Sequence, residues 1–342
     1  MKKVVMVWRL ILVFIPARAL RYLLPGREIY RGTEMDTKAR ALGRLADLIR
    51  PPDILPTIEE SRASLLTSVQ KFDLPAPELA RIEDMTVHGA AGDLPARIYC
   101  AKKASGGLLP TLVYLHGGGF VQGGIETHHA LCAKLALLSG GMVISVGYRL
   151  APEHPFPAGL DDAKAAFRDI CARASELGID PARTGLGGDS AGATFAAVAA
   201  QALRKDQRAR PAFQVLIYPL TDGHLRTDSA RELEAAYILP HKRLVWYRDT
   251  YMGTFSDLSD PRLSPLLASD LADLPPCLIL TAGFDPLSDD GHLYAEKLSA
   301  AGNKVTHWHY PAQIHGFLNL TGVIGEGSEA IARVANWIKA RR

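Results

Sequence analysis

Short apolar runs alternate with amphipathic segments from about residue 109 to the end of the chain. The apolar runs are rich in Val, Ile and Leu and predict buried strands, whereas the segments with a repeat of about 3.6 residues predict helices. This alternation is typical of a mostly parallel sheet covered by helices on both faces. The predicted strands are residues 109–117, 142–148, 183–188, 213–219, 276–283 and 304–310, and the predicted helices include residues 161–178, 191–205 and 328–341.

Two segments interrupt the alternation. Residues 31–75 are predicted to be helices separated by the proline-rich sequence PPDILP, and residues 221–262 form a long insertion. Long insertions in compact folds are commonly lids, and open α/β sheets bind ligands at the carboxyl ends of their strands. We therefore expect both segments to form one helical cap over that edge. The insertion contains five aromatic residues of interest, Tyr237, Trp246, Tyr247, Tyr251 and Phe255. A minority of them should line the pocket, and the others should pack in the core of the insertion.

The chain is accordingly divided into an extension (residues 1–30), a two-part cap (31–75 and 221–262) and a two-part core (76–220 and 263–342). Hydrophobic residues make up 48% and charged residues 22% of the 342 residues, so a large core can be buried. The net charge of +3 is too small to suggest a nucleic-acid partner. No CxxC pair occurs, and buried free thiols are expected at Cys100, Cys132, Cys171 and Cys277.

The N-terminus combines apolar and basic residues. Residues 1–50 carry eleven Lys or Arg against four Asp or Glu, and Val4–Ile15 is an apolar run with Arg9 inside it. A spanning helix needs about 20 apolar residues, so this run is too short to cross a bilayer. An interfacial helix or a helix packed on the cap is favoured, and a signal peptide cleaved after Ala19 is a third alternative. We expect a cytoplasmic protein, with peripheral membrane contact through residues 1–30 under the interfacial alternative and secretion under the third.

The strongest chemical signal is the sequence Gly188-Asp189-Ser190-Ala191-Gly192 between a predicted strand and a predicted helix. A serine in this context lies on a sharp, strained turn that exposes its hydroxyl, and small residues are needed on both sides to avoid clashes. The helix that follows directs its N-terminal dipole at the same place. The sequence therefore predicts Ser190 as a nucleophile.

A glycine-rich sequence lies upstream, where His116-Gly117-Gly118-Gly119 ends a predicted strand. Successive glycines allow a bent backbone whose N–H groups face a substrate carbonyl. We expect an oxyanion hole formed by the N–H groups of Gly117, Gly118 and Ala191. His116 is expected to hold the loop through a structural hydrogen bond, because a catalytic histidine in this motif order follows the serine.

The acid and the base should each lie on a loop after a strand, in that order along the chain. Asp285 follows the predicted strand 276–283, and His315 follows the strand 304–310. His315 would accept the Ser190 proton while Asp285 orients the imidazole. The competing acids Asp289 and Asp290 lie where the next helix begins and are better explained as partners of its dipole.

Four other histidines have plainer interpretations. His307 and His309 alternate along a strand without Cys or carboxylate ligands in a matching pattern, so strand packing is favoured over a metal site. His128 and His129 follow the glycine loop and are expected to begin a helix, with pocket lining as the alternative.

Together the motifs resemble the hormone-sensitive-lipase group, or family IV, of the α/β-hydrolase esterases. The sequence departs from the family pattern at Ala193, where a third Gly is usual, and at Ser288, where Arg is common; neither change removes a predicted catalytic group. The resemblance implies an α/β-hydrolase fold with a helical cap. Its motifs occur in order over roughly residues 85–340: HGGGF, GDSAG, YRLAPEHPFPAGLDD, DPRLSPL, GFDPLSDDG and HGF.

The resemblance also implies a serine carboxylesterase acting on short- to medium-chain acyl esters through an acyl-enzyme. It makes Ser190 the nucleophile, Asp285 the acid and His315 the base, with oxyanion donors at Gly117, Gly118 and Ala191. A homodimer is expected, and no cofactor, metal or nucleic acid. A catalytically inactive small-molecule-binding relative and an amidase or arylformamidase are the alternatives, and the presence of all three triad residues favours an enzyme.

Overall fold

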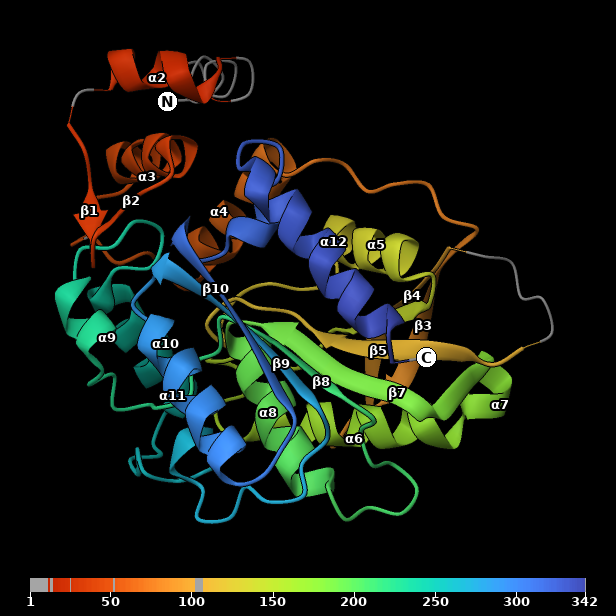
Figure 1. The fold of residues 1–342 in the computed structure, drawn as a ribbon. Coiled ribbons are helices and arrows are strands. Elements are labelled where there is room, and N and C mark those ends of the chain that lie inside the picture. The colour runs from red at the N-terminus through yellow and green to blue at the C-terminus, as the bar shows by residue number, and fades with distance from the viewer. Residues whose placement is uncertain (1–11, 13–14, 25, 52, 102–106, 342) are drawn as a thin grey trace.

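An eight-stranded sheet runs through the centre of the molecule, and helices cover both of its faces (Figure 1). The computed structural model describes residues 12, 15–24, 26–51, 53–101 and 107–341. The strand order is β10-β9-β8-β7-β5-β6-β4-β3. The bounds are β3 Arg81–His88, β4 Asp93–Cys100, β5 Leu109–Leu115, β6 Met142–Val146, β7 Ile179–Asp189, β8 Gln214–Ile217, β9 Cys277–Phe284 and β10 Val305–Ile314.

Strands β5 to β10 pair in parallel, which confirms the predicted mostly parallel sheet. Strands β3 and β4 form an antiparallel hairpin that joins the sheet at β6 and was not predicted. The reason lies in β3, an edge strand whose sequence RIEDMTVH is mostly exposed and therefore contains no apolar run. The predicted helix over residues 161–178 is divided at Arg173 into α6 (Ala158–Ala172) and α7 (Ala174–Leu177).

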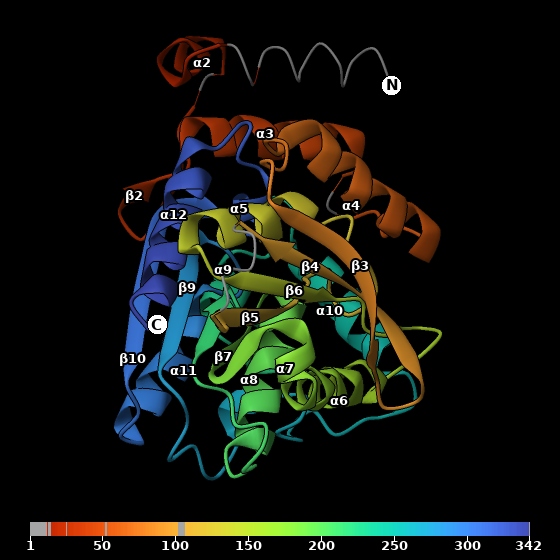
Figure 2. The same cartoon turned by 90° about the vertical axis from the view of Figure 1, so that its right-hand side faces the viewer.

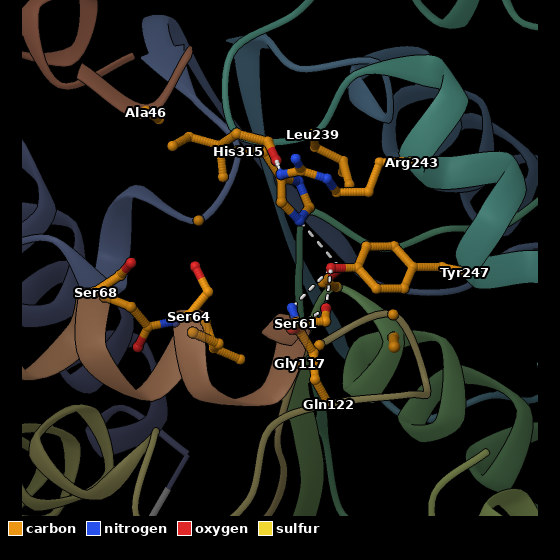
Figure 3. Close-up of a pocket in the computed structure, with 18 of the residues that line it drawn as sticks. Ala46, Ser61, Ser64, Ser68, Gly117, Gln122, Leu239, Arg243, Tyr247 and His315 are labelled. Carbon is orange, nitrogen blue, oxygen red and sulfur yellow. Dashed lines mark hydrogen bonds between the residues drawn. The ribbon is translucent and has the colours of Figure 1, made fainter. Parts of the chain in front are cut away.

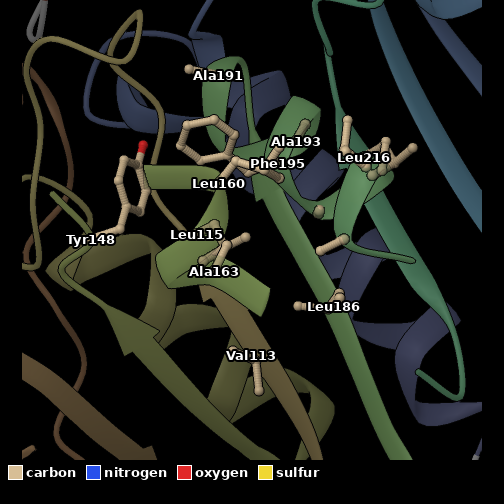
Figure 4. Packing of buried hydrophobic residues seen from close by; sticks show 14 of the residues in the cluster. Val113, Leu115, Tyr148, Leu160, Ala163, Leu186, Ala191, Ala193, Phe195 and Leu216 are labelled. Carbon is tan, nitrogen blue, oxygen red and sulfur yellow. The ribbon is translucent and has the colours of Figure 1, made fainter. Parts of the chain in front are cut away.

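Successive residues of the central strand β5 face opposite sides of the sheet. Val113 and Leu115 belong to one buried core (Figure 4), and Leu112 and Tyr114 belong to the other. Burying one such side chain contributes about 1.5–3 kcal/mol, so the two cores hold the sheet firmly beneath the site. The first core is covered by α6, α8 (Ala191–Leu203) and α11 (Ser288–Ala300), and the second by α5 (His129–Ser139) and α12 (Gly325–Lys339).

Two segments outside these layers line a common pocket with the carboxyl end of β7. The first contains α3 (Thr37–Ile49) and α4 (Ile58–Phe72), and the second contains α9 (Asp228–Glu232) and α10 (His241–Met252). Thr57 and Glu60 form a capping box at the start of α4. The other elements are α2 (Ala17–Leu23), which lies beyond α3 at the margin of the molecule (Figure 2), β1 (Ile29–Tyr30), β2 (Thr33–Glu34), η1 (Pro265–Leu267) and η2 (Phe317–Asn319).

The N-terminal run Val4–Ile15 lies almost entirely outside the described residues. Leu12 and Leu20 are fully buried, whereas Tyr22 and Leu23 on α2 are exposed. No helix in the described part of the chain is both long and apolar enough to cross a bilayer. The four cysteines are buried and form no disulfide bond within the described part of the chain, in agreement with the prediction.

The first turn of α11 fastens both outer segments to the core. Asp289 and Asp290 lie in this turn, as predicted, and they also bind other elements. Asp289 pairs with Arg31 at 2.7 Å. Asp290 accepts the backbone N–H groups of Thr221 and Asp222 at 2.8 and 2.9 Å, at the start of the insertion. Burial raises the pKa of Asp290 to about 7.

We expect this raised pKa to make stability depend on pH. Ionisation of Asp290 is less favourable in the folded chain than in the unfolded chain, so the free energy of unfolding should fall as pH rises from about 4 to about 7. Asp290→Asn keeps an oxygen acceptor and carries no charge. The difference between the melting temperature of Asp290→Asn and that of the wild type should therefore increase, in favour of the variant, between pH 5 and pH 8.

Thermal melts at both pH values measure this difference. Glu329→Gln, at an exposed position of α12, serves as the control and should show no such gain. A melting-temperature difference for Asp290→Asn that does not change with pH would contradict the prediction.

Candidate active site

Ser190 occupies a strained turn between β7 and α8. Its φ of 52° and ψ of −121° are sparsely populated by residues other than glycine. A Cβ at Gly188 or Gly192 would overlap the carbonyl oxygen of Leu115. The turn therefore requires glycine on both sides of the serine, as the sequence pattern predicted.

Ser190, His315 and Asp285 form one hydrogen-bonded series. His315 Nε2 lies 3.0 Å from Ser190 Oγ, and its Nδ1 lies 2.7 Å from Asp285 Oδ2. The carboxylate is fully buried, and its second oxygen accepts the N–H of Leu287 at 2.9 Å. A carboxylate at Nδ1 favours the tautomer whose Nε2 accepts a proton. Since β9 and β10 are adjacent parallel strands, their carboxyl ends bring Asp285 and His315 together.

The glycine loop differs from the prediction in one respect. The N–H of Gly117 donates to Asp189 Oδ1 at 2.9 Å, so this N–H is already engaged by a carboxylate, which argues against the predicted role of Gly117 as an oxyanion donor. The N–H groups of Gly118 and Gly119 have no hydrogen-bond partner among the described residues. Both glycines have positive φ, +128° and +61°, which explains why side chains are disfavoured there.

Asp189 is a buried carboxylate that the sequence analysis did not single out. Tyr114 Oη donates to it at 2.8 Å, His128 Nε2 lies 3.1 Å from it, and Asn319 Nδ2 lies at 3.4 Å. Burial alone would raise the pKa of Asp189, but His128 and the hydrogen bonds from Tyr114 and Gly117 outweigh that effect and hold the pKa below its ordinary value. The position of Asp189, next to the serine and at the end of a buried strand, was the available signal.

The other histidines behave largely as predicted. His116 Nδ1 lies 2.9 Å from the carbonyl oxygen of Gly117, and its ring stacks on Tyr148 at 4.2 Å. Burial lowers the pKa of His116 to about 3, so the ring is neutral and holds the loop. His307 and His309 face Thr281 Oγ1 at 3.0 and 2.9 Å.

The expectation for His128 agrees with the structure only in part. It lies at the start of α5, as expected, and it also lines the pocket, which was the alternative.

The two outer segments hold the glycine loop through hydrogen bonds (Figure 3). Ser61 Oγ on α4 donates to Gln122 Oε1 at 2.6 Å, and Gln122 Nε2 donates to Tyr247 Oη on α10 at 2.8 Å. Arg62 Nε donates to the carbonyl oxygen of Val121 at 2.9 Å. A Cβ at Gly119 would overlap the Tyr247 ring. Both outer segments therefore contact the loop that carries the free N–H groups.

Ser190 and His315 line a cavity of about 270 Å³. Its wall combines the sheet edge and glycine loop with side chains from α3, α4 and α10. Tyr247 is the one residue of the five predicted aromatics that lines it, and Tyr251 instead stacks on Phe120 at 4.2 Å. The cavity-lining residues of the outer segments include Leu42, Leu45, Asp47, Arg50, Ser61, Ser64, Leu65, Ser68, Val69, Leu239, Arg243, Leu244, Tyr247 and Arg248.

Comparisons with known proteins identify related esterases and ester hydrolases. A carboxylic ester hydrolase of Mycobacterium tuberculosis, LipN, is 38% identical over 330 residues, which cover 94% of this chain and 86% of that protein. An ethyl acetate hydrolase of Pseudomonas putida is 37% identical, covering 85% of this chain and 92% of its own. The solved ester hydrolase EH1AB1 from the Lake Arreo metagenome, bound to a bipyridine phosphonate derivative, is 42% identical with a TM-score of 0.84 and covers 88% of this chain and 97% of its own.

A family model described as the alpha/beta hydrolase fold matches residues 112–319, which include Ser190, Asp285 and His315. The relatives extend the match over most of the chain on both sides. The resemblance inferred from the motifs is thereby confirmed: the chain belongs to the α/β-hydrolase fold family.

Proposed function

We propose that the protein is a serine carboxylesterase that hydrolyses esters of short- to medium-chain acids. The observation that carries the proposal is the series Ser190–His315–Asp285, whose serine and histidine line a cavity. The names of the relatives, a carboxylic ester hydrolase and an ethyl acetate hydrolase, support the ester class. The short to medium acyl range agrees with the cavity volume of about 270 Å³.

In the proposed reaction Ser190 Oγ attacks the ester carbonyl carbon and its proton passes to His315 Nε2. His315 then gives this proton to the departing alcohol, which leaves an acyl-enzyme. A water molecule then attacks the carbonyl carbon of the acyl-enzyme and gives its proton to His315. His315 passes this proton to Ser190 Oγ as the carboxylic acid is released. Asp285 stabilises the imidazolium in both halves, because it is buried and hydrogen-bonded to Nδ1.

We propose Gly118, Gly119 and Ala191 as the oxyanion donors. The N–H groups of Gly118 and Gly119 have no partner among the residues that the structure describes, both glycines line the cavity with Ser190, and Ala191 is the first residue of α8. This set replaces Gly117, whose N–H is held by Asp189. We further propose that residues 31–75 and 221–262 act as a cap, since helices from both segments line the cavity.

Two alternatives are separated by simple assays. An inactive binding relative is disfavoured because nucleophile, base and acid lie within hydrogen-bond distance of one another. An amidase or arylformamidase would use the same residues, because the acyl chemistry is shared and only the leaving group differs. Turnover of p-nitrophenyl esters with no turnover of the matching anilides supports the esterase, and the reverse preference supports the amidase.

Ser190→Ala should abolish ester hydrolysis, with a loss in kcat of about 10⁶-fold, because the three residues act as a unit. A fluorophosphonate probe should label the wild type and fail to label the variant. Labelling that survives the substitution, with unchanged stoichiometry, would place the nucleophile at another residue.

Tyr247→Phe should lower kcat about 3- to 10-fold, because it removes one neutral hydrogen bond that holds the oxyanion loop. Tyr251→Phe, one helical turn further along α10, is a matched control, since the Tyr251 hydroxyl is buried and has no hydrogen-bond partner in the described part of the chain. Steady-state kinetics and thermal melts of both variants separate loop positioning from stability. Equal kcat values for the two variants would contradict a role for the Tyr247 hydroxyl.

We also propose that the N-terminus contacts membrane surfaces. On α2 the exposed apolar residues Tyr22 and Leu23 lie beside the exposed Arg18 and Arg21, a pairing that suits an anionic interface. A cytoplasmic location and a homodimer stay predictions, and sedimentation velocity measures the second.

A chain lacking residues 1–30, and with them α2, should keep its turnover of short esters and lose most of its co-sedimentation with anionic vesicles. Added salt should weaken the binding of the full chain, because part of the attraction is electrostatic. Vesicles of neutral lipid are the control. Equal partitioning of the two chains would rule out the interfacial role and favour packing of this segment on the protein itself.

A further inference from the structure

Arg243 presents an incompletely paired positive charge to the cavity. It lies on α10, and its side chain extends into the cavity (Figure 3). One terminal nitrogen, Nη1, donates to the carbonyl oxygen of Ile238 at 2.9 Å. Its Nε is buried and has no hydrogen-bond partner among the described residues. Within the described part of the chain Arg243 forms no ion pair, so most of its donor capacity is unused.

The charges around Arg243 leave this part of the cavity positive. Three arginines line the cavity, Arg50, Arg243 and Arg248, against two carboxylates, Asp47 and Asp189, and the Asp189 carboxylate already accepts hydrogen bonds from Tyr114 and Gly117. Arg50 pairs with Glu60 at 3.4 Å, and Arg248 pairs with Asp249 at 2.8 Å. Arg243 is the one of the three without such a partner.

The surroundings of Arg243 also disfavour its charge. Burial lowers the pKa of Arg243, and repulsion from Arg50 acts in the same direction. Asp47 attracts Arg243 but forms no ion pair with it, and burial raises the pKa of the Asp47 carboxyl. A guanidinium with this environment is stabilised by an anion that enters the cavity, because buried charges are favourable only when they are paired.

The neighbouring wall offers hydroxyl groups as well. Ser61, Ser64 and Ser68 follow one face of α4 at spacings of three and four residues, and all three line the cavity. Leu65 and Val69 lie on the same face. The cavity therefore combines an apolar surface, suited to a hydrocarbon chain, with donors suited to a polar end group.

We propose that the enzyme prefers esters that carry a free carboxylate at a distance from the scissile bond, and that this carboxylate pairs with Arg243. The planar guanidinium can bind a carboxylate through two parallel hydrogen bonds, which gives geometric selectivity as well as attraction. The proposal rests on the proposed esterase function, because the same cavity must hold the reacting ester at Ser190. Arg243 acts here as a specificity residue and takes no part in the chemical step.

The test compares hydrolysis of monoethyl esters of dicarboxylic acids, from succinate to suberate, with that of the corresponding diethyl esters. Ester cleavage is followed by ethanol release. One or more of the monoesters should have a higher kcat/KM than its neutral diethyl ester. Arg243→Met should lower kcat/KM for that monoester about 10- to 100-fold, the range expected for loss of a charge-assisted hydrogen-bonded pair. Arg243→Lys should retain part of the preference, since it keeps the charge and loses the planar fork.

Turnover of the diethyl esters separates this proposal from the proposed function. If the wild type hydrolyses no ester, the esterase proposal fails; if it hydrolyses diethyl esters well and monoesters no better, only the carboxylate preference fails. Arg210→Met, at an exposed arginine paired with Asp273, controls for a general change of charge and should leave both rates unchanged. Thermal melts show whether Arg243→Met is folded. Equal losses on charged and neutral esters in the folded Arg243→Met variant would overturn the proposal.

Discussion

The buried carboxylate of Asp189 is the group on which the geometry of the site depends. It receives hydrogen bonds from Tyr114 at the end of β5 and from Gly117 in the glycine loop, and it faces His128 at the start of α5. A buried carboxylate is stable only where donors surround it. These segments must therefore meet at one point, and that point lies immediately before Ser190 in the chain. The requirement of Asp189 for donors thus places the nucleophile, the loop and the helix relative to one another.

The same requirement decides which N–H groups face the cavity. Because Asp189 accepts the N–H of Gly117, the loop bends beyond that residue, and the next two peptide groups are left without partners in the described structure. The bend needs positive φ at Gly118 and Gly119. A carbonyl oxygen of Gln122 and the ring of Tyr247 approach these two glycines so closely that a side chain at either position would collide. The conformation of the loop is therefore fixed by the Asp189 carboxylate on one side and by the Tyr247 ring of α10 on the other.

Much of this could be predicted from the sequence, because the relevant signals are local. The turn at Ser190 is indicated by the small residues beside it, and Asp285 and His315 follow apolar strands in a fixed order. The edge hairpin of β3 and β4 escaped prediction because an exposed strand needs no apolar run. The direction of the Gly117 N–H could not be predicted either, since it depends on Asp189, which is 72 residues away in sequence. Successive glycines indicate that the backbone bends, but they do not determine the direction of each N–H group.

Helix α10 connects the proposed recognition residue Arg243 to the glycine loop, because one face of this helix carries the residues that reach both. Arg243, Tyr247 and Tyr251 follow one another at intervals of four residues on α10 and therefore share a face. Arg243 borders the cavity, Tyr247 binds Gln122, and Tyr251 stacks on Phe120 in the loop. A shift of α10 that brought the guanidinium nearer to a ligand would also move the two aromatic rings that bear on the loop. The proposed ligand of Arg243 would therefore contact the same helix that holds the glycine loop through Tyr247 and Tyr251.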